Sequence, residues 1–196
     1  MMSEITNDAM ILISISFQAL KRAERGNKST FLCDCTVIIA FAIFFIEANL
    51  NGIIDELQKN DEINKFFGYD HPGLRDKLIW FYNEYVASEK VINKNQLVQQ
   101  EINEELEKEF PGFSNIYDFR NNIAHGVINE SQANLENASQ LRIKAKEIVN
   151  KLFVDLSKKG VDIHRNINYD AAISRLYDSP QDDSFDNGIR LVFPSS

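Results

Sequence analysis

Apolar residues recur at helical spacing over most of residues 10–160. In residues 10–24 they fall at positions 10, 13, 17 and 20, and in residues 135–156 they repeat every three or four positions. Such spacing places apolar side chains on one face of an α-helix. Gly160 follows the second pattern, and glycine is typical just beyond a helix C-terminus. Both segments are therefore predicted to be amphipathic helices.

Residues 36–58 form a more apolar pattern. The first three turns are apolar nearly all round, which is typical of a helix at the centre of a bundle. Glu47 and Asn51 interrupt this surface, and because they are four residues apart they share one face. Either they lie at the edge of the core and pair with neighbours, or they form a polar network that supports a site. Both interpretations require hydrogen-bonding partners.

Four further segments lie between these helices. Residues 60–67 extend the central helix or form a short turn, residues 74–86 carry an aromatic stripe with Trp80 at its side, and residues 91–110 form a helix with a solvated glutamate face. Ser114 is the predicted N-cap of the next helix, and Gly126 takes the left-handed position after its end. The chain is predicted to be an all-α bundle over residues 1–160, with a less regular tail over residues 161–196.

Composition and charge narrow the classes of function. Of 196 residues 44% are hydrophobic and 26% are charged, which fits a protein with a substantial core, and the net charge of −8 excludes a broad basic surface. The start of the chain does not have the pattern of a signal peptide, and the apolar run 36–46 is about half the length of a membrane span. Cys33 and Cys35 are predicted to be free, mostly buried thiols rather than metal ligands. A cytoplasmic protein without metal, cofactor or membrane partner is expected.

Candidate chemistry concentrates in residues 118–126, which contain Arg120, Asn121 and His125. Asn121 and His125 share a helix face, whereas Arg120 and His125 point about 140° apart. A histidine can act as base or acid, and an arginine can hold a phosphate. RNA cleavage by the 2′-hydroxyl needs a base, an acid and positive charge on the phosphorane. One motif supplies half of these groups, and two copies across a two-fold axis would supply all of them.

A structural interpretation of the same residues stays open. Histidine is favoured at a helix C-terminus by the helix dipole, and Arg120 can simply pair with Asp118 or with a glutamate of the acidic helix. The cations within residues 142–165 outnumber the acids there, and they form either a basic strip near the motif or an ordinary solvated helix face.

The segment from Arg120 to His125, followed by Gly126, resembles the R-x4–6-H motif of HEPN domains. In that family the motif lies near the end of one helix and precedes a long final helix, which is the order predicted here. The apolar helix carrying Glu47 and Asn51 is similar to an early HEPN helix of the form E-x-x-x-N. The resemblance covers roughly residues 10–160.

The resemblance implies an up-and-down bundle of four to five helices that dimerises. It further implies that the dimer cleaves RNA without metal, at a cleft on the dimer axis, leaving a 2′,3′-cyclic phosphate. It implies that His125 is the general base or acid, that Arg120 holds the scissile phosphate and that Asn121 orients either group. It further implies a toxin or phage-defence effector, with an antitoxin or other partner protein. Val127 stands where toxins paired with a nucleotidyltransferase usually have tyrosine, which argues against that subtype. The alternative is a non-catalytic helical interaction module.

Overall fold

A computed structural model describes residues 5–26, 31–87, 92, 99–128, 131–161 and 163. Every regular element within these residues is helical, so the predicted all-α bundle is confirmed. The elements are α1 Ile5–Glu24, α2 Phe31–Glu56, α3 Asn60–Phe67, α4 Leu74–Phe81, the π-helical turn η1 Tyr82–Val86, α5 Gln99–Glu109, α6 Phe113–Ala124 and α7 Leu135–Lys158. Nearly all of the predicted tail lies outside the described residues.

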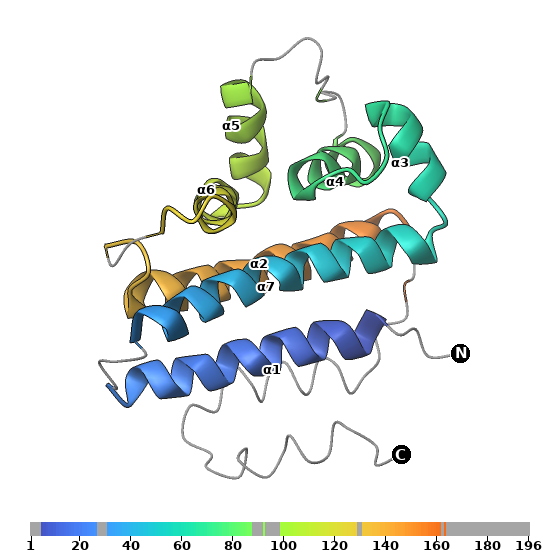
Figure 1. Ribbon diagram of the computed structural model, residues 1–196. Helices are drawn as coiled ribbons and strands as arrows, with labels where there is room; N and C mark the ends of the chain where they lie inside the picture. The colour runs from blue at the N-terminus through green and yellow to red at the C-terminus, as the bar shows by residue number, and fades with distance from the viewer. Residues whose placement is uncertain are drawn as a thin grey trace.

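The helices form three layers (Figure 1). α2 and α7 lie side by side in the middle layer, α1 packs along one face of α2, and α3 to α6 cover the other side. α1 and α2 are antiparallel, whereas α2 and α7 run in the same direction, so the four short helices connect two parallel long ones. The described residues hold more helices than the four to five that the resemblance implies, because each of the four segments between α2 and α7 forms a short helix of its own.

α2 is the core helix, as its apolar pattern predicted. It begins at Phe31, five residues before the predicted start, and Ile38, Ile39 and Phe45 on it are fully buried. Arg22 of α1 forms an ion pair with the buried carboxylate of Asp34 at 2.9 Å, which joins the two helices near their connection.

By length and composition α2 could also cross a bilayer, and it is alone in this among the described helices. The core helix of a soluble bundle meets the same test, and α2 packs here against α1, α6 and α7. The feature is therefore weak evidence, and the expectation that the chain has no membrane partner stays a prediction.

The predicted aromatic segment, residues 74–86, forms α4 and then η1 without a break. Leu78, Phe81 and Tyr82 of the predicted stripe are buried, and so is Trp80, which was expected at its side. Phe110, which follows α5, brings this stripe into the core: its ring centroid lies 6.4 Å from that of Phe81.

The start of α6 differs from the prediction. Gly112, with φ of 94°, is the N-cap, and Ser114 lies inside the first turn. The Glu107 carboxylate of α5 accepts hydrogen bonds from the backbone N–H groups of Gly112, at 2.7 Å, and Ser114, at 2.8 Å. Glu107 thus satisfies donors that the Ser114 side chain was expected to satisfy, and it is not simply part of a solvated acidic face. A Cβ at Gly112 would lie 2.8 Å from Cγ of Lys144, too close for any other residue. Glycine at this position therefore allows the start of α6 to pack closely against α7.

The two cysteines are both free, as predicted, but they differ in exposure. Cys35 is buried, whereas Cys33 is exposed, which corrects the expectation that the thiols are mostly buried. Burial, together with the neighbouring charge of Asp34, raises the pKa of the Cys35 thiol above its ordinary value. Cys35 is therefore a core residue and a poor nucleophile.

Candidate functional site

The C-terminus of α6 places His125 at the protein surface. Gly126 has φ of 65°, the left-handed conformation predicted for it. Its N–H donates to the Ile123 carbonyl at 3.1 Å, and the Val127 N–H donates to the Asn122 carbonyl at 2.9 Å. This pair of bonds is the Schellman motif, which ends a helix sharply. His125 is the last residue before the reversal, and its side chain is exposed.

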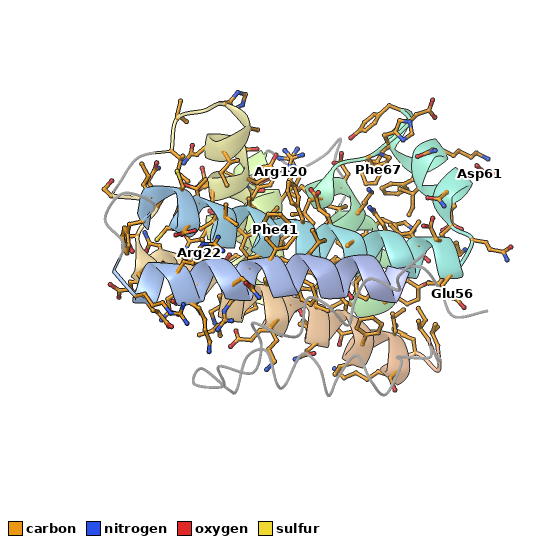
Figure 2. The ribbon with its side chains drawn as sticks, turned by 60° about the horizontal axis from the view of Figure 1, so that its bottom comes forward. Arg22, Phe41, Glu56, Asp61, Phe67 and Arg120 are labelled. Atoms are coloured by element: carbon orange, nitrogen blue, oxygen red, sulfur yellow. The ribbon has the colours of Figure 1, made fainter. Side chains whose placement is uncertain are left out.

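Arg120, one and a half turns earlier on α6, points toward the middle of α2 (Figure 2). Its Nε lies 3.5 Å from Oε1 of Glu47, with 40% of the arginine side chain and 26% of the glutamate side chain exposed. The contact engages one edge of the guanidinium group. The partner of Arg120 is thus a residue of the central helix, not Asp118 or a glutamate of the acidic helix as the structural interpretation expected, and the contact is a partly exposed ion pair of small energetic value.

Asn51, one turn after Glu47, has a partner on a different helix. Its Oδ1 accepts a hydrogen bond from Nζ of Lys77 on α4 at 2.7 Å. One further turn along α2, Oδ1 of Asp55 accepts a hydrogen bond from Nδ2 of Asn60 on α3 at 2.6 Å. Glu47, Asn51 and Asp55 therefore form a polar stripe, with one residue in each of three successive turns, that joins α2 to α6, α4 and α3.

Lys77 was missed by the sequence analysis. It lies 26 residues from Asn51, and no local spacing links the two. Burial lowers the pKa of Lys77 below its ordinary value of 10.5, while the charges of Glu47 and Asp55 act in the opposite direction. Glu47 thus acts on both Lys77 and Arg120, while Asp55 adds a second carboxylate on the side of Lys77.

We expect Lys77→Met to raise the free energy of unfolding at neutral pH, by on the order of 0.5 kcal/mol, the range usual for partly exposed positions. The folded lysine releases its proton at lower pH than the unfolded one, so its charge costs stability below the folded pKa. That cost disappears as pH rises toward 10.5. The advantage of the methionine variant should therefore shrink at alkaline pH. Urea denaturation across pH, with Lys65→Met as control, measures it; a variant less stable than wild type at neutral pH contradicts the prediction.

The three motif residues are not joined to one another through their side chains. The backbone N–H of His125 donates to the Asn121 carbonyl at 2.9 Å, as in any helix. Within the described part of the chain, no hydrogen bond or ion pair involves the His125 imidazole or links it to Arg120. In a single chain, His125 therefore faces solvent while Arg120 faces α2.

Two exposed apolar side chains lie close to the motif. Phe44 is 47% exposed and precedes Glu47 by three residues, so it lies on the same face of α2. Its ring packs edge-on against Phe41, with centroids 5.9 Å apart. Val127, two residues after His125, is 56% exposed.

The cations of α7 do not form a free basic strip. Lys144 pairs with Glu147 at 2.7 Å, and Lys158 pairs with Asp155 at 2.9 Å. Lys151 contacts Asp155 at 2.7 Å and Glu109 at 3.3 Å. Arg142 is buried, and Arg165 lies outside the described residues. These pairs favour the interpretation of a solvated, locally neutralised helix face.

Other site types have little support in this region. Among the described residues, no group of three or more His, Cys, Asp or Glu side chains is arranged to hold a metal ion. Comparison with protein-family models, with curated proteins and with solved structures finds no match to this chain.

Proposed function

We propose that this protein is an endoribonuclease of the HEPN type that cleaves RNA without a metal ion, at a composite site on the axis of a homodimer. The observation that carries the proposal is the position of Arg120. Its guanidinium group is oriented from one edge by Glu47, and 40% of the side chain remains exposed. An arginine held in this way can bind a phosphate with the rest of its planar fork.

The chemistry divides between two chains. One His125 accepts the proton of the ribose 2′-hydroxyl as its oxygen attacks phosphorus, and the other His125 donates a proton to the departing 5′-oxygen. The two Arg120 side chains stabilise the charge that develops on the phosphorane. The P–O5′ bond breaks, and the products are a 2′,3′-cyclic phosphate and a free 5′-hydroxyl. Asn121, on the face of His125, orients the imidazole or the phosphate.

A second chain is supported by what surrounds the motif. Among the described residues the exposed imidazole lacks a catalytic partner. Phe44, on the face of α2 that carries Glu47, and Val127, two residues after His125, leave apolar surface exposed. Burying such side chains against a twin copy is favourable and would bring the two motifs together. The role of a toxin or phage-defence effector, held inactive by an antitoxin or other protein partner, is part of the same proposal.

One observation favours the alternative function, a non-catalytic helical interaction module. The contact between Arg120 and Glu47 joins α6 to α2, and together with the bond between Lys77 and Asn51 it resembles an ordinary set of interhelical polar contacts. In that case the exposed apolar side chains bind a partner protein, and His125 has no chemical role.

Mixing wild-type chains with His125→Asn chains tests the composite site. After subunit exchange in EDTA, an equal mixture should cleave RNA at about one quarter of the wild-type rate, because only dimers of two intact chains carry a complete site. A complete site in each chain would instead leave about one half of the rate. That second result contradicts the composite site, and wild-type protein that cleaves no RNA contradicts the function.

A further inference from the structure

Arg75, in the first turn of α4, is a cation without a counter-charge among the described residues. Its Nε and Nη1 atoms are buried and have no hydrogen-bond partner among the described residues. Buried donors are nearly always satisfied in proteins, so such a group calls for an acceptor that the described residues do not supply, such as water or a ligand. A missing carboxylate partner within the described part of the chain is unusual, because the whole chain has 29 acidic residues against 21 lysines and arginines.

The guanidinium group of Arg75 is also held in a fixed orientation. Its Cζ lies 5.4 Å from the centroid of the Tyr117 ring on α6. Stacking on an aromatic ring restricts the planar group while leaving its N–H donors at the edge. The neighbouring acid, Asp76, accepts a hydrogen bond from the Tyr69 hydroxyl, and Lys77, beyond it, donates to Asn51.

Tyr117 connects Arg75 to the proposed catalytic site. It precedes Arg120 by three residues on α6, so the two side chains lie on one helix face, about 5–6 Å apart at Cβ. Two guanidinium groups, one from α4 and one from α6, are therefore placed along the same side of α6. Both can contact phosphate groups of one extended strand.

We propose that Arg75 binds a second backbone phosphate of the RNA, next to the phosphate held by Arg120. The inference rests on the proposed function for the identity of the ligand, but the anion site itself rests on Arg75 and Tyr117. The substrate class that it implies is single-stranded RNA, in which successive phosphates can reach both arginines.

The test measures binding without cleavage. The probe is a short single-stranded RNA with methylated 2′-hydroxyls, and its Kd is measured from low to high salt. Arg75→Gln should weaken binding about tenfold, the value of one charged hydrogen bond, and reduce the slope of log Kd against log salt by about 0.7, the value of one phosphate contact. Arg75→Lys should keep the slope, and Lys65→Gln, with the same loss of charge on α3, should change neither quantity.

A second probe separates this site from the ribonuclease proposal. Inorganic pyrophosphate should raise the melting temperature of the wild type but not that of Arg75→Gln. If the wild type binds pyrophosphate through Arg75 but neither binds nor cleaves RNA, the anion site stands and the proposed function falls. If RNA binds Arg75→Gln with the Kd and slope of the wild type, or if Kd rises without a change of slope in a variant of lower melting temperature, the second phosphate site is overturned. Binding of neither probe by the wild type overturns both proposals.

Discussion

His125→Asn lowers the rate of RNA cleavage by about 10²- to 10⁴-fold, the contribution typical of general acid–base catalysis. The substitution removes proton transfer from both halves of the proposed site, since each chain of the homodimer carries the change. Asparagine is polar and fits the helix end, so the Schellman motif at Gly126 should persist. The measurement is cleavage of a labelled single-stranded RNA in EDTA, with circular dichroism and melting temperature for both proteins.

The chain provides a matched control in His71. This histidine is also exposed, and it lies in the loop before α4 with φ of 59°, a conformation that asparagine tolerates. His71→Asn should cleave at the wild-type rate. If the two variants lose activity equally, or if His125→Asn retains the wild-type rate, His125 has no role in proton transfer and the proposed mechanism fails.

The largest loss of stability is expected for Phe110→Ala, at about 3–5 kcal/mol. The ring is fully buried where α5 ends, it contacts Phe81, and Nζ of Lys151 lies 5.6 Å from its centroid. Alanine leaves a cavity between α5, α4 and α7, and the neighbouring helices can close it only in part. Most domains are stable by only about 5–15 kcal/mol, so the loss is a large share of the total.

Urea denaturation at one fixed protein concentration measures this difference, because dimerisation would make the stability depend on concentration. The control is Phe66→Ala on α3, the same chemical change at a ring that is 51% exposed. Its loss should stay within about 1 kcal/mol, the value of the edge contact with Phe67. Equal losses in the two variants would show that Phe110 is not a core residue.

The sequence predicted the elements whose signals are local. The apolar spacing of α7 and the continuous apolar surface of α2 each correspond to a long helix, and Gly126 takes the left-handed conformation expected after α6. Periodicity and the conformational freedom of glycine act within a few residues, so one sequence is enough to read them. The packing of other helices against both faces of α2 likewise follows from its apolar composition.

The missed features depend on contacts between distant segments. Glu107 displaced Ser114 as the group that satisfies the start of α6, because the turn between α5 and α6 returns the carboxylate to these N–H groups. Lys77 was recognised only through its hydrogen bond to Asn51 on α2, and Arg75 only through its stacking on Tyr117 of α6. Glu47 and Asn51 were recognised as a pair that needs partners, but helical spacing could not tell which helices would supply them.

The placement of α2 has a consequence for folding during synthesis on the ribosome. Helices emerge from the ribosome in chain order, so α1 is already outside when the most apolar segment, Phe31–Glu56, follows it. The α1–α2 hairpin can shield one side of this segment at once, through contacts that are close in sequence. The opposite side of α2 stays uncovered by α7 until Leu135–Lys158 has been synthesised. A nascent chain that stalls after α2 but before α7 has been synthesised would expose the apolar face of α2 that α7 covers. Such a chain would be expected to bind chaperones.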